Sequence, residues 1–258
     1  MQRWVRFADK DGEISFGTID GPAITKFEGE LFGDPVGSPV RYATQDVVLL
    51  QPCEPTKIVA LWNNFHASAD KQNLAKPETP LYFIKPSSCL IGPLEPIRRP
   101  PNYAGRIMYE GELGIVIGAQ CKSVAEADAD QVIFGYTCLN DVTAFPIIQE
   151  ASGFEQWTRA KSFDTFGAIG PCIATGIDPG SLSVRTLVNG RVRQDYPVSD
   201  MIIGVPRLVS AISHDMTLYP GDIIACGTSL GVLPMKQNTK VEVMIDGIGT
   251  LENVFEPA

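Results

Sequence analysis

Short runs of apolar residues alternate along the chain with Gly, Pro, Asn and Asp. Runs of about four to eight residues bounded by such turn residues are typical of β-strands. Near the amino terminus, the runs Trp4–Phe7 and Ile14–Ile19 flank Asp11-Gly12, a dipeptide that favours hairpins, and Asp20-Gly21 offers a second turn. We therefore expect residues 1–50 to form a small β-rich domain.

The rest of the chain also predicts mainly strands. The apolar runs are Lys57–Trp62, Glu112–Ile117, Val132–Leu139, Leu182–Val188, Val192–Tyr196, Ile223–Ala225, Val241–Ile245 and Thr250–Val254. Helices are predicted for Ser123–Asp130, which opens with a Ser-x-x-Glu capping pattern, and for Arg207–Ser213. The polar stretch over 63–80 is either a mobile lid or a long surface loop. We expect a β-dominated α+β protein whose second domain covers 51–258.

Composition and charge exclude several classes of protein. With 44% hydrophobic and 20% charged residues, the chain has the composition of an ordinary globular protein. A net charge of −9 disfavours nucleic-acid binding, which needs a cationic surface. No apolar stretch approaches the roughly 20 residues that cross a membrane. The six cysteines form no Cys-x-x-Cys pair, which favours reduced thiols in a cytoplasmic protein.

The first candidate chemistry is a group of three carboxylates. Glu110 and Glu112 are two positions apart at the start of a predicted strand, so both side chains point to the same face. Asp141 follows the end of the predicted strand Val132–Leu139. Carboxylates gathered at strand ends offer the oxygen ligands that Mg²⁺, Mn²⁺ or Ca²⁺ prefer. Spacing alone leaves two alternatives open, namely that the glutamates only block a sheet edge and that Asp141 caps a helix.

Eight short motifs, taken together, indicate a family relationship that the spacing of the carboxylates alone does not. In chain order the motifs are Pro80-Leu-Tyr-Phe-Ile-Lys-Pro86, Tyr109-Glu-Gly-Glu-Leu113, Gly135-Tyr-Thr-Cys-Leu-Asn-Asp-Val-Thr-Ala144, Lys161-Ser-Phe-Asp-Thr-Phe-Gly-Ala-Ile-Gly-Pro171, Val188-Asn-Gly190, Leu218-Tyr-Pro-Gly-Asp222, Gly227-Thr-Ser-Leu-Gly-Val232 and Ile248-Gly249. Together they resemble the fumarylacetoacetate hydrolase family, in the family's own order, over the segment from Lys57 to Val254. The first 50 residues carry little of this resemblance.

The resemblance implies a mixed β-sandwich roll that usually forms a homodimer. It implies that Glu110, Glu112 and Asp141 bind Mg²⁺ or Mn²⁺, with Ca²⁺ as a substitute in crystals. It also implies a small 2-oxo or β-diketo acid as substrate, as in aromatic catabolism. The leading hypothesis is C–C bond hydrolysis or keto–enol isomerisation of such an acid through a metal-stabilised enolate. The alternatives are a decarboxylase or tautomerase of an oxaloacetate-like acid, and an inactive family member that only binds metal and acid.

The same resemblance suggests roles for other residues. Lys161 matches the family's active-site lysine, whose ammonium can stabilise negative charge that develops on the substrate. His66, in the polar stretch, is the candidate general base, because a neutral imidazole near pH 7 can accept a proton. Thr228 lies in a glycine loop whose amides and hydroxyl could hold a carboxylate. Asn140, beside Asp141, is a further candidate for substrate binding.

The chain departs from the family pattern at two places. Many members carry His-x-x-Glu in the polar stretch, but the third residue after the histidine here is Ala69, so Asp70, Glu78 or a more distant acid would have to orient the imidazole. Many members also carry Arg-Asp where this chain has Phe145-Pro146. That arginine usually holds a substrate carboxylate in a bidentate manner. Arg159 is a candidate replacement for it.

Overall fold

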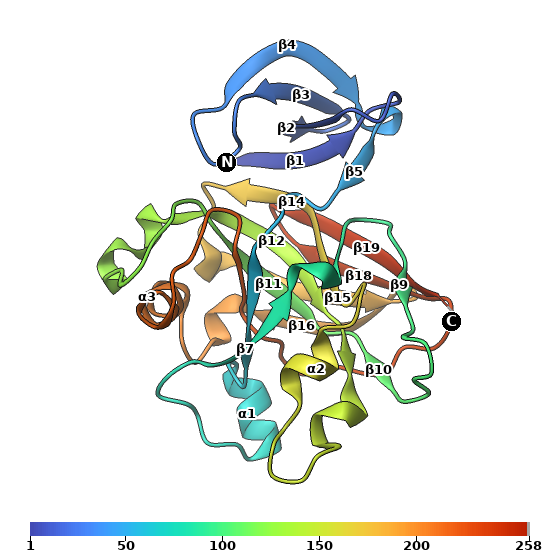
Figure 1. Cartoon of the computed structure of the whole chain (residues 1–258), viewed down its shortest axis with the longest axis vertical. Coiled ribbons are helices and arrows are strands. Elements are labelled where there is room, and N and C mark those ends of the chain that lie inside the picture. Colours follow the sequence, from blue (N-terminus) through green and yellow to red (C-terminus); the bar gives the residue numbers. More distant parts are fainter. Residues whose placement is uncertain (257–258) are drawn as a thin grey trace.

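The protein is described by a computed structural model that covers residues 1–256 and consists mainly of β-strands (Figure 1). Twelve strands form one large sheet: β1 (Gln2–Ala8), β2 (Ile14–Asp20), β3 (Ala23–Glu28), β4 (Val36–Ala43), β5 (Val48–Leu50), β6 (Lys57–Trp62), β7 (Leu81–Pro86), β8 (Leu90–Ile91), β11 (Gly111–Ile117), β12 (Ile133–Asp141), β14 (Gly167–Thr175) and β17 (Ile223–Ala225). Their order is β4-β3-β2-β1-β14-β12-β11-β17-β6-β7, with β5 beside β1 and β8 beside β14. Most neighbours are antiparallel, but β17 runs parallel to β6, so the sheet is mixed.

A second sheet lies against the middle of the first. Its five strands are β9 (Ile97–Arg98), β15 (Ser183–Val188), β16 (Arg191–Pro197), β18 (Thr239–Ile245) and β19 (Gly249–Glu256), in the order β16-β15-β18-β19-β9. Strands β15, β18 and β19 contact β11, β12 and β14 of the large sheet. A further pair, β10 (Ile107–Met108) and β13 (Thr143–Ala144), lies near the site described below. The expected β-dominated α+β fold with a mixed sandwich is confirmed.

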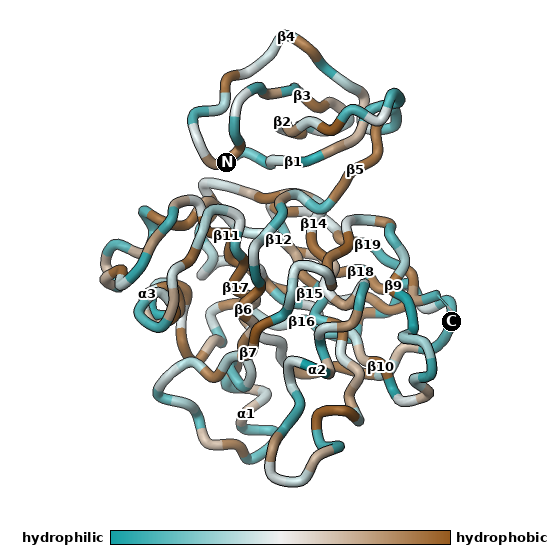
Figure 2. Tube along the Cα trace, in the orientation of Figure 1, coloured by the Kyte–Doolittle hydropathy of each residue, from teal (hydrophilic) through white to brown (hydrophobic). Residues whose placement is uncertain are grey.

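The core lies between the two sheets and beneath the helices. Every residue of β11 is buried, from Gly111 to Ile117, because this strand is covered on both faces. Figure 2 shows the most hydrophobic segments in the middle of the body, where β11, β17 and β6 lie. A strand buried on both faces is expected to read as a continuous apolar run. Two carboxylates at the start of such a strand therefore sit where burial of charge is costly.

The amino-terminal strands extend the large sheet rather than standing apart from it. Strand β1 pairs with β14, with Trp4 opposite Ile173. The Trp4 ring packs against Phe27, with ring centroids 4.8 Å apart, and against Phe134 of β12 at 6.1 Å. Figure 1 shows β1 to β4 at one end of the molecule, next to β14. Hydrogen bonds and aromatic packing thus join residues 1–50 to the rest.

The helices are few and short. The α-helices are α1 (His66–Gln72), α2 (Trp157–Lys161) and α3 (Val205–Asp215), and the 3-10 helices are η1 (Thr44–Asp46), η2 (Ser87–Cys89), η3 (Glu126–Gln131), η4 (Phe145–Gln149), η5 (Pro179–Ser181) and η6 (Val198–Asp200). The late helix predicted over 207–213 is confirmed as α3. None of the helices within residues 1–256 combines the length and apolar character needed to cross a bilayer.

The helix predicted from the capping pattern at Ser123 differs from the prediction. The segment forms the 3-10 helix η3, which starts after Ala125 and has no side-chain cap. Ser123 has a φ of 55°, outside the helical region. The backbone N–H groups of Ser123 and Val124 instead donate to the carbonyl and hydroxyl of Ser213 in α3. A tertiary hydrogen bond therefore satisfies the N–H of Ser123, which the side chain of Glu126 would have satisfied in a capping box.

Candidate metal and substrate site

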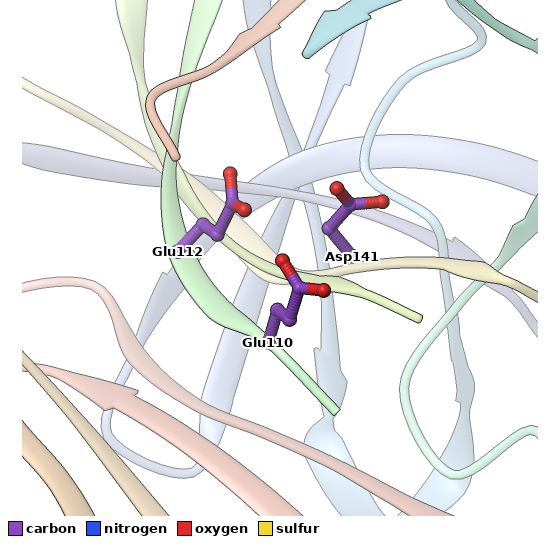
Figure 3. A group of neighbouring side chains, drawn as sticks. All are labelled: Glu110, Glu112 and Asp141. Atoms are coloured by element: carbon purple, nitrogen blue, oxygen red, sulfur yellow. The ribbon is translucent and has the colours of Figure 1, made fainter. Parts of the chain in front are cut away.

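Strand pairing brings the three predicted carboxylates together. Glu110 immediately precedes β11 and Glu112 is its second residue, while Asp141 ends β12. The two strands are antiparallel, with Gly111 opposite Asn140, and the backbone N–H of Asp141 donates to the carbonyl of Glu110 at 2.8 Å. Opposite and diagonal residues on one face of an antiparallel pair are close enough to interact. Figure 3 shows the three carboxylate groups directed toward one another.

The cluster is too buried to be a solvated patch of acid. One carboxylate oxygen from each residue lies within 4.8 Å of the others. Glu112 and Asp141 are fully buried, and the side chain of Glu110 is 15% exposed. Burial raises the pKa of both Glu110 and Glu112. Burial also raises the pKa of Asp141, but two neighbouring lysines lower it by more, so its net shift is downward. Positive charge is therefore required here.

One carboxylate oxygen of the cluster has no partner within the described part of the chain. Glu112 Oε2 accepts a hydrogen bond of 2.9 Å from the backbone N–H of Gly227, whereas its Oε1 is buried and has none. An unsatisfied buried acceptor costs about 1–3 kcal/mol, and more when charged. Oxygen-only donor sets suit Mg²⁺ or Mn²⁺ better than zinc. The residues present therefore fit a hard divalent cation held by Glu110, Glu112 and Asp141.

Two buried lysines approach these carboxylates. Lys161, the last residue of α2, donates to Glu110 Oε2 at 2.9 Å and to Asp141 Oδ2. Burial lowers the pKa of Lys161, but the three carboxylates raise it by more, so it is held as an ammonium. Lys85 Nζ lies 2.7 Å from Asp141 Oδ1. Three carboxylates face two ammonium groups, so the cluster has a formal charge of −1 before a cation binds.

The role of Lys85 was missed by the sequence analysis, although the residue lies in a quoted motif. It also donates to the carbonyl of Phe166 at 3.2 Å and to the carbonyl of Lys161. Phe83 and Lys85 are two positions apart in β7 and are both buried on the same face of that strand. A lysine at a buried position of an otherwise apolar strand was the available signal, since such a residue is almost never buried unless it is paired.

A cavity of about 370 Å³ opens beside the carboxylates. Its polar lining comes from Asn63, Ser68, Gln72, Glu110, Lys161, Thr228 and Ser229. Its aromatic lining comes from Trp62, Phe83, Phe145 and Trp157. Three of the predicted site residues, Glu110, Lys161 and Thr228, therefore share one pocket. A concave, mainly apolar pocket with a few converging polar groups is the usual form of a small-molecule site.

The glycine loop after β17 is joined to both sheets. The Thr228 hydroxyl donates to the carbonyl of Gly111 at 3.0 Å and accepts from Gln194 Nε2 at 2.8 Å. Its hydrogen-bonding capacity is thus used to hold the loop against β11. The neighbouring Ser229 hydroxyl is buried and has no partner among the described residues, although Ser229 lines the pocket. Ser229 is the second polar group that the sequence analysis missed.

The structure does not bring His66 into the pocket. His66 begins α1 and is half-buried, but the residues of α1 that line the cavity are Ser68 and Gln72. These two are four positions apart and share one helix face. His66 is two positions before Ser68, a rotation of about 200° around the helix axis, so its side chain points to the opposite face. Gln72 Nε2 donates to Ser68 Oγ at 2.9 Å. A neutral hydroxyl–amide pair, not an imidazole, therefore faces the cavity.

Two further candidates also lie outside the pocket lining. Arg159 forms an ion pair with Glu150, and both side chains are more than half exposed. Asn140 is buried, and its Oδ1 accepts from the backbone N–H of Glu110 at 2.9 Å. Because side chains alternate along β12, Asn140 points to the face opposite Asp141. It orients the backbone of Glu110 rather than contacting the cavity.

Comparison with known proteins agrees with this geometry. The family model described as "Fumarylacetoacetate (FAA) hydrolase C-terminal" matches residues 57–256. The chain belongs to the fumarylacetoacetate hydrolase family. A second family model, described as "Rv2993c-like, N-terminal", matches residues 2–52. The family resemblance predicted from the ordered motifs is confirmed.

Three family relatives illustrate the range of reported activities. A crystal structure described as 2-hydroxyhepta-2,4-diene-1,7-dioate isomerase from Mycobacterium marinum is 40% identical with a TM-score of 0.90, covering 100% of this chain and 99% of that one. Oxaloacetate tautomerase YisK of Bacillus subtilis is 35% identical over 85% of this chain and 76% of its own. Maleylpyruvate hydrolase from Sphingobium, solved with manganese and pyruvate, is 29% identical with a TM-score of 0.80, covering 99% of both chains.

Proposed function

We propose that this chain is a Mg²⁺- or Mn²⁺-dependent enzyme that interconverts the keto and enol forms of a small 2-oxo acid. The observation that supports it is the pairing of three converging buried carboxylates with the Lys161 ammonium at one wall of the cavity. When bound there, the cation would act as a Lewis acid that lowers the free energy of the enolate by several kcal/mol. The relative named oxaloacetate tautomerase supports this choice of reaction.

Lys161 is suited to stabilise the negative charge that develops on the substrate in such a reaction. An ammonium has three hydrogens, and two of those on Lys161 are directed to Glu110 and Asp141. The third is available for the substrate oxygen at which negative charge develops. Preorganised donors of this kind stabilise charge without reorganisation at the moment of reaction. The unpartnered Ser229 hydroxyl is the best-placed neutral donor for the substrate carboxylate.

The residues that line the cavity favour isomerisation over hydrolysis. Hydrolysis of a C–C bond needs a base that activates water, and histidine is the commonest such group. The chain has two histidines. His66 lies outside the pocket lining, and His214 Nδ1 lies 2.8 Å from the carbonyl of Ser210 in α3. Keto–enol exchange requires no activated water, so it places a smaller demand on the groups that are present.

Stopped-flow absorbance would test this proposal. The Mn²⁺-loaded protein is mixed in separate runs with the enol forms of oxaloacetate and of phenylpyruvate, and loss of the enol absorbance is followed while released CO₂ is measured in parallel. We expect loss of at least one enol faster than the buffer rate, with no matching release of CO₂. CO₂ formed at the same rate would instead identify a decarboxylase. Metal binding without acceleration of either process would indicate an inactive metal- and acid-binding member.

We also infer the setting in which the protein works. The two family models match residues 2–52 and 57–256, which supports a division into a small domain over 1–50 and a catalytic domain over 51–258. Six free, buried cysteines suit a reducing cytoplasm. The resemblance to the family supports a homodimer, and the isomerase and hydrolase relatives support a role in aromatic catabolism. Light scattering of the purified chain would test the dimer.

A further inference from the structure

We propose that the substrate of this site is a 2-oxo acid whose far end is uncharged and aromatic. The proposal rests on the function proposed above, which places the 2-oxo acid group beside Lys161 and the three carboxylates. It concerns the other end of the molecule, which the cavity must also accommodate. The cavity, about 370 Å³, is within the range of about 300–1,000 Å³ that holds drug-sized ligands.

The first support is an aromatic wall made by Trp62, Phe83 and Trp157. The rings of Phe83 and Trp157 are stacked, with centroids 5.9 Å apart and planes 20° from parallel. The rings of Trp62 and Trp157 lie 5.6 Å apart. All three side chains line the cavity. Aromatic side chains attract flat apolar groups through offset or edge-to-face contacts.

The wall begins directly beside the chemical end of the site. Lys161 Nζ lies 5.3 Å from the centroid of the Phe83 ring, so the ammonium and the wall are adjacent. A ligand whose 2-oxo acid group reaches Lys161 therefore places its next atoms against Phe83. The remaining lining continues the apolar character with Leu61, Met108 and Ile148.

The second support is the absence of a free cation. Lys161 is the single Lys, Arg or His side chain among the described residues that line this cavity, and it already pairs with Glu110 and Asp141. Two arginines lie near the cavity without lining it. Arg159 pairs with Glu150, and the guanidinium of Arg106 lies over the ring of Phe145, 5.4 Å from its centroid. A second carboxylate on the substrate would lose hydration in the cavity without a cation in the lining to pair with, which is costly.

Phe145 places a ring rather than a cation at the cavity. Its side chain lines the cavity while remaining 42% exposed. Apart from Glu110 and Lys161, the polar side chains of the lining are neutral, and two of them, Ser68 and Gln72, hydrogen-bond to each other. The lining therefore suits an aryl group better than a second carboxylate.

Two unreactive probes that differ only at the far end would test the proposal. Oxanilate and N-oxalylglycine share an oxamate head, but the first has a phenyl tail and the second a carboxylate tail. Calorimetry with the Mn²⁺-loaded full chain should show oxanilate binding at least about tenfold more tightly, because its ring is buried without loss of a hydrated charge. Equal or tighter binding of N-oxalylglycine would overturn the aromatic-tail proposal and leave the proposed function standing. Binding of neither probe would overturn both.

A matched pair of variants sharpens the test. Phe145→Arg places a guanidinium at the cavity, and should lower the ratio of the two affinities about tenfold in favour of N-oxalylglycine. Leu233→Arg is the control, because Leu233 is similarly exposed, at 45% against 42% for Phe145, but does not line the cavity. An unchanged ratio in a folded Phe145→Arg protein would count against the proposal.

Fluorescence locates the ring independently of turnover. The chain has three tryptophans, and two of them, Trp62 and Trp157, line the cavity. A Trp4→Phe variant leaves only these two as emitters. Oxanilate should change the tryptophan emission of this variant, and the titration should give the same Kd as calorimetry. If saturating oxanilate leaves the emission unaltered, the assigned position of the ring is contradicted.

Discussion

Of the three proposed metal ligands, Glu112 is the one for which the structure makes the most unusual prediction. Its carboxylate is fully buried, its Oε1 has no partner among the described residues, and burial raises its pKa well above the ordinary range. In the protein without metal, the charge on Glu112 is therefore a cost to folding. Glu112→Gln removes that charge and keeps the shape. The amide oxygen of the glutamine can still accept from the backbone N–H of Gly227, and its NH₂ group can donate to Glu110 or Asp141.

We expect Glu112→Gln to stabilise the metal-free protein while it abolishes tight Mn²⁺ binding. An unsatisfied buried acceptor costs about 1–3 kcal/mol, so the free energy of unfolding should rise by about this amount near pH 8. For a chain of this size, each kcal/mol raises Tm by roughly 2–4 °C. Mn²⁺ at one hundred times its Kd should add about 2.7 kcal/mol to the wild type and nothing to the variant.

The dependence on pH follows from the sign of the shift. A carboxyl group whose pKa is raised by folding contributes stability below its unfolded pKa of about 4.3, and this contribution is lost as pH rises through the folded pKa. The metal-free wild type should therefore be less stable at pH 8 than at pH 5, and the variant should show a smaller decrease. Glu110, whose pKa is also raised, retains part of the slope.

Denaturant melts at pH 5 and pH 8, with and without Mn²⁺, would measure these free energies of unfolding. Glu13→Gln provides the control, since Glu13 is exposed and should change neither stability nor metal binding. A metal-free Glu112→Gln protein that is less stable than the wild type would refute the claim that Glu112 is an uncompensated charge. Retention of the Mn²⁺-induced stabilisation would refute its assignment as a ligand.

Three other predictions concern Lys161, His66 and the cysteine thiols. Lys161→Met should reduce the rate of enol loss by about 10²–10³ because a preorganised donor is lost, and calorimetry should show that Mn²⁺ still binds. His66→Ala should leave that rate within about twofold, since His66 lies outside the pocket lining, whereas a general base would cost about 10²–10⁴. Native thiols should react slowly with a disulfide reagent at pH 8, because burial raises the pKa of Cys53 and Cys172 to about 12, and all six should react once the chain is unfolded.

The sequence by itself determined the positions of the strands and placed the side chains of Glu110 and Glu112 on the same face. Turn dipeptides and apolar runs are local signals, so the run Lys57–Trp62 and the hairpin around Asn189-Gly190 were found at or near their observed bounds. Alternation along a strand also placed Glu110 and Glu112 on one face before any fold was known. Proximity of Asp141 to them came from the family resemblance, because sheet register depends on pairing between distant segments.

Only the tertiary structure decided which polar side chains enter the cavity. His66 and Ser68 are two positions apart, and the orientation of α1 against the sheet selects Ser68. Lys85 acquires its importance from Asp141, which lies on another strand, and no local pattern records that contact. The physical reason is the distance along the chain over which each signal acts. Propensity and periodicity act over a few residues, whereas the charge balance and the lining of the site depend on distant segments that only folding brings together.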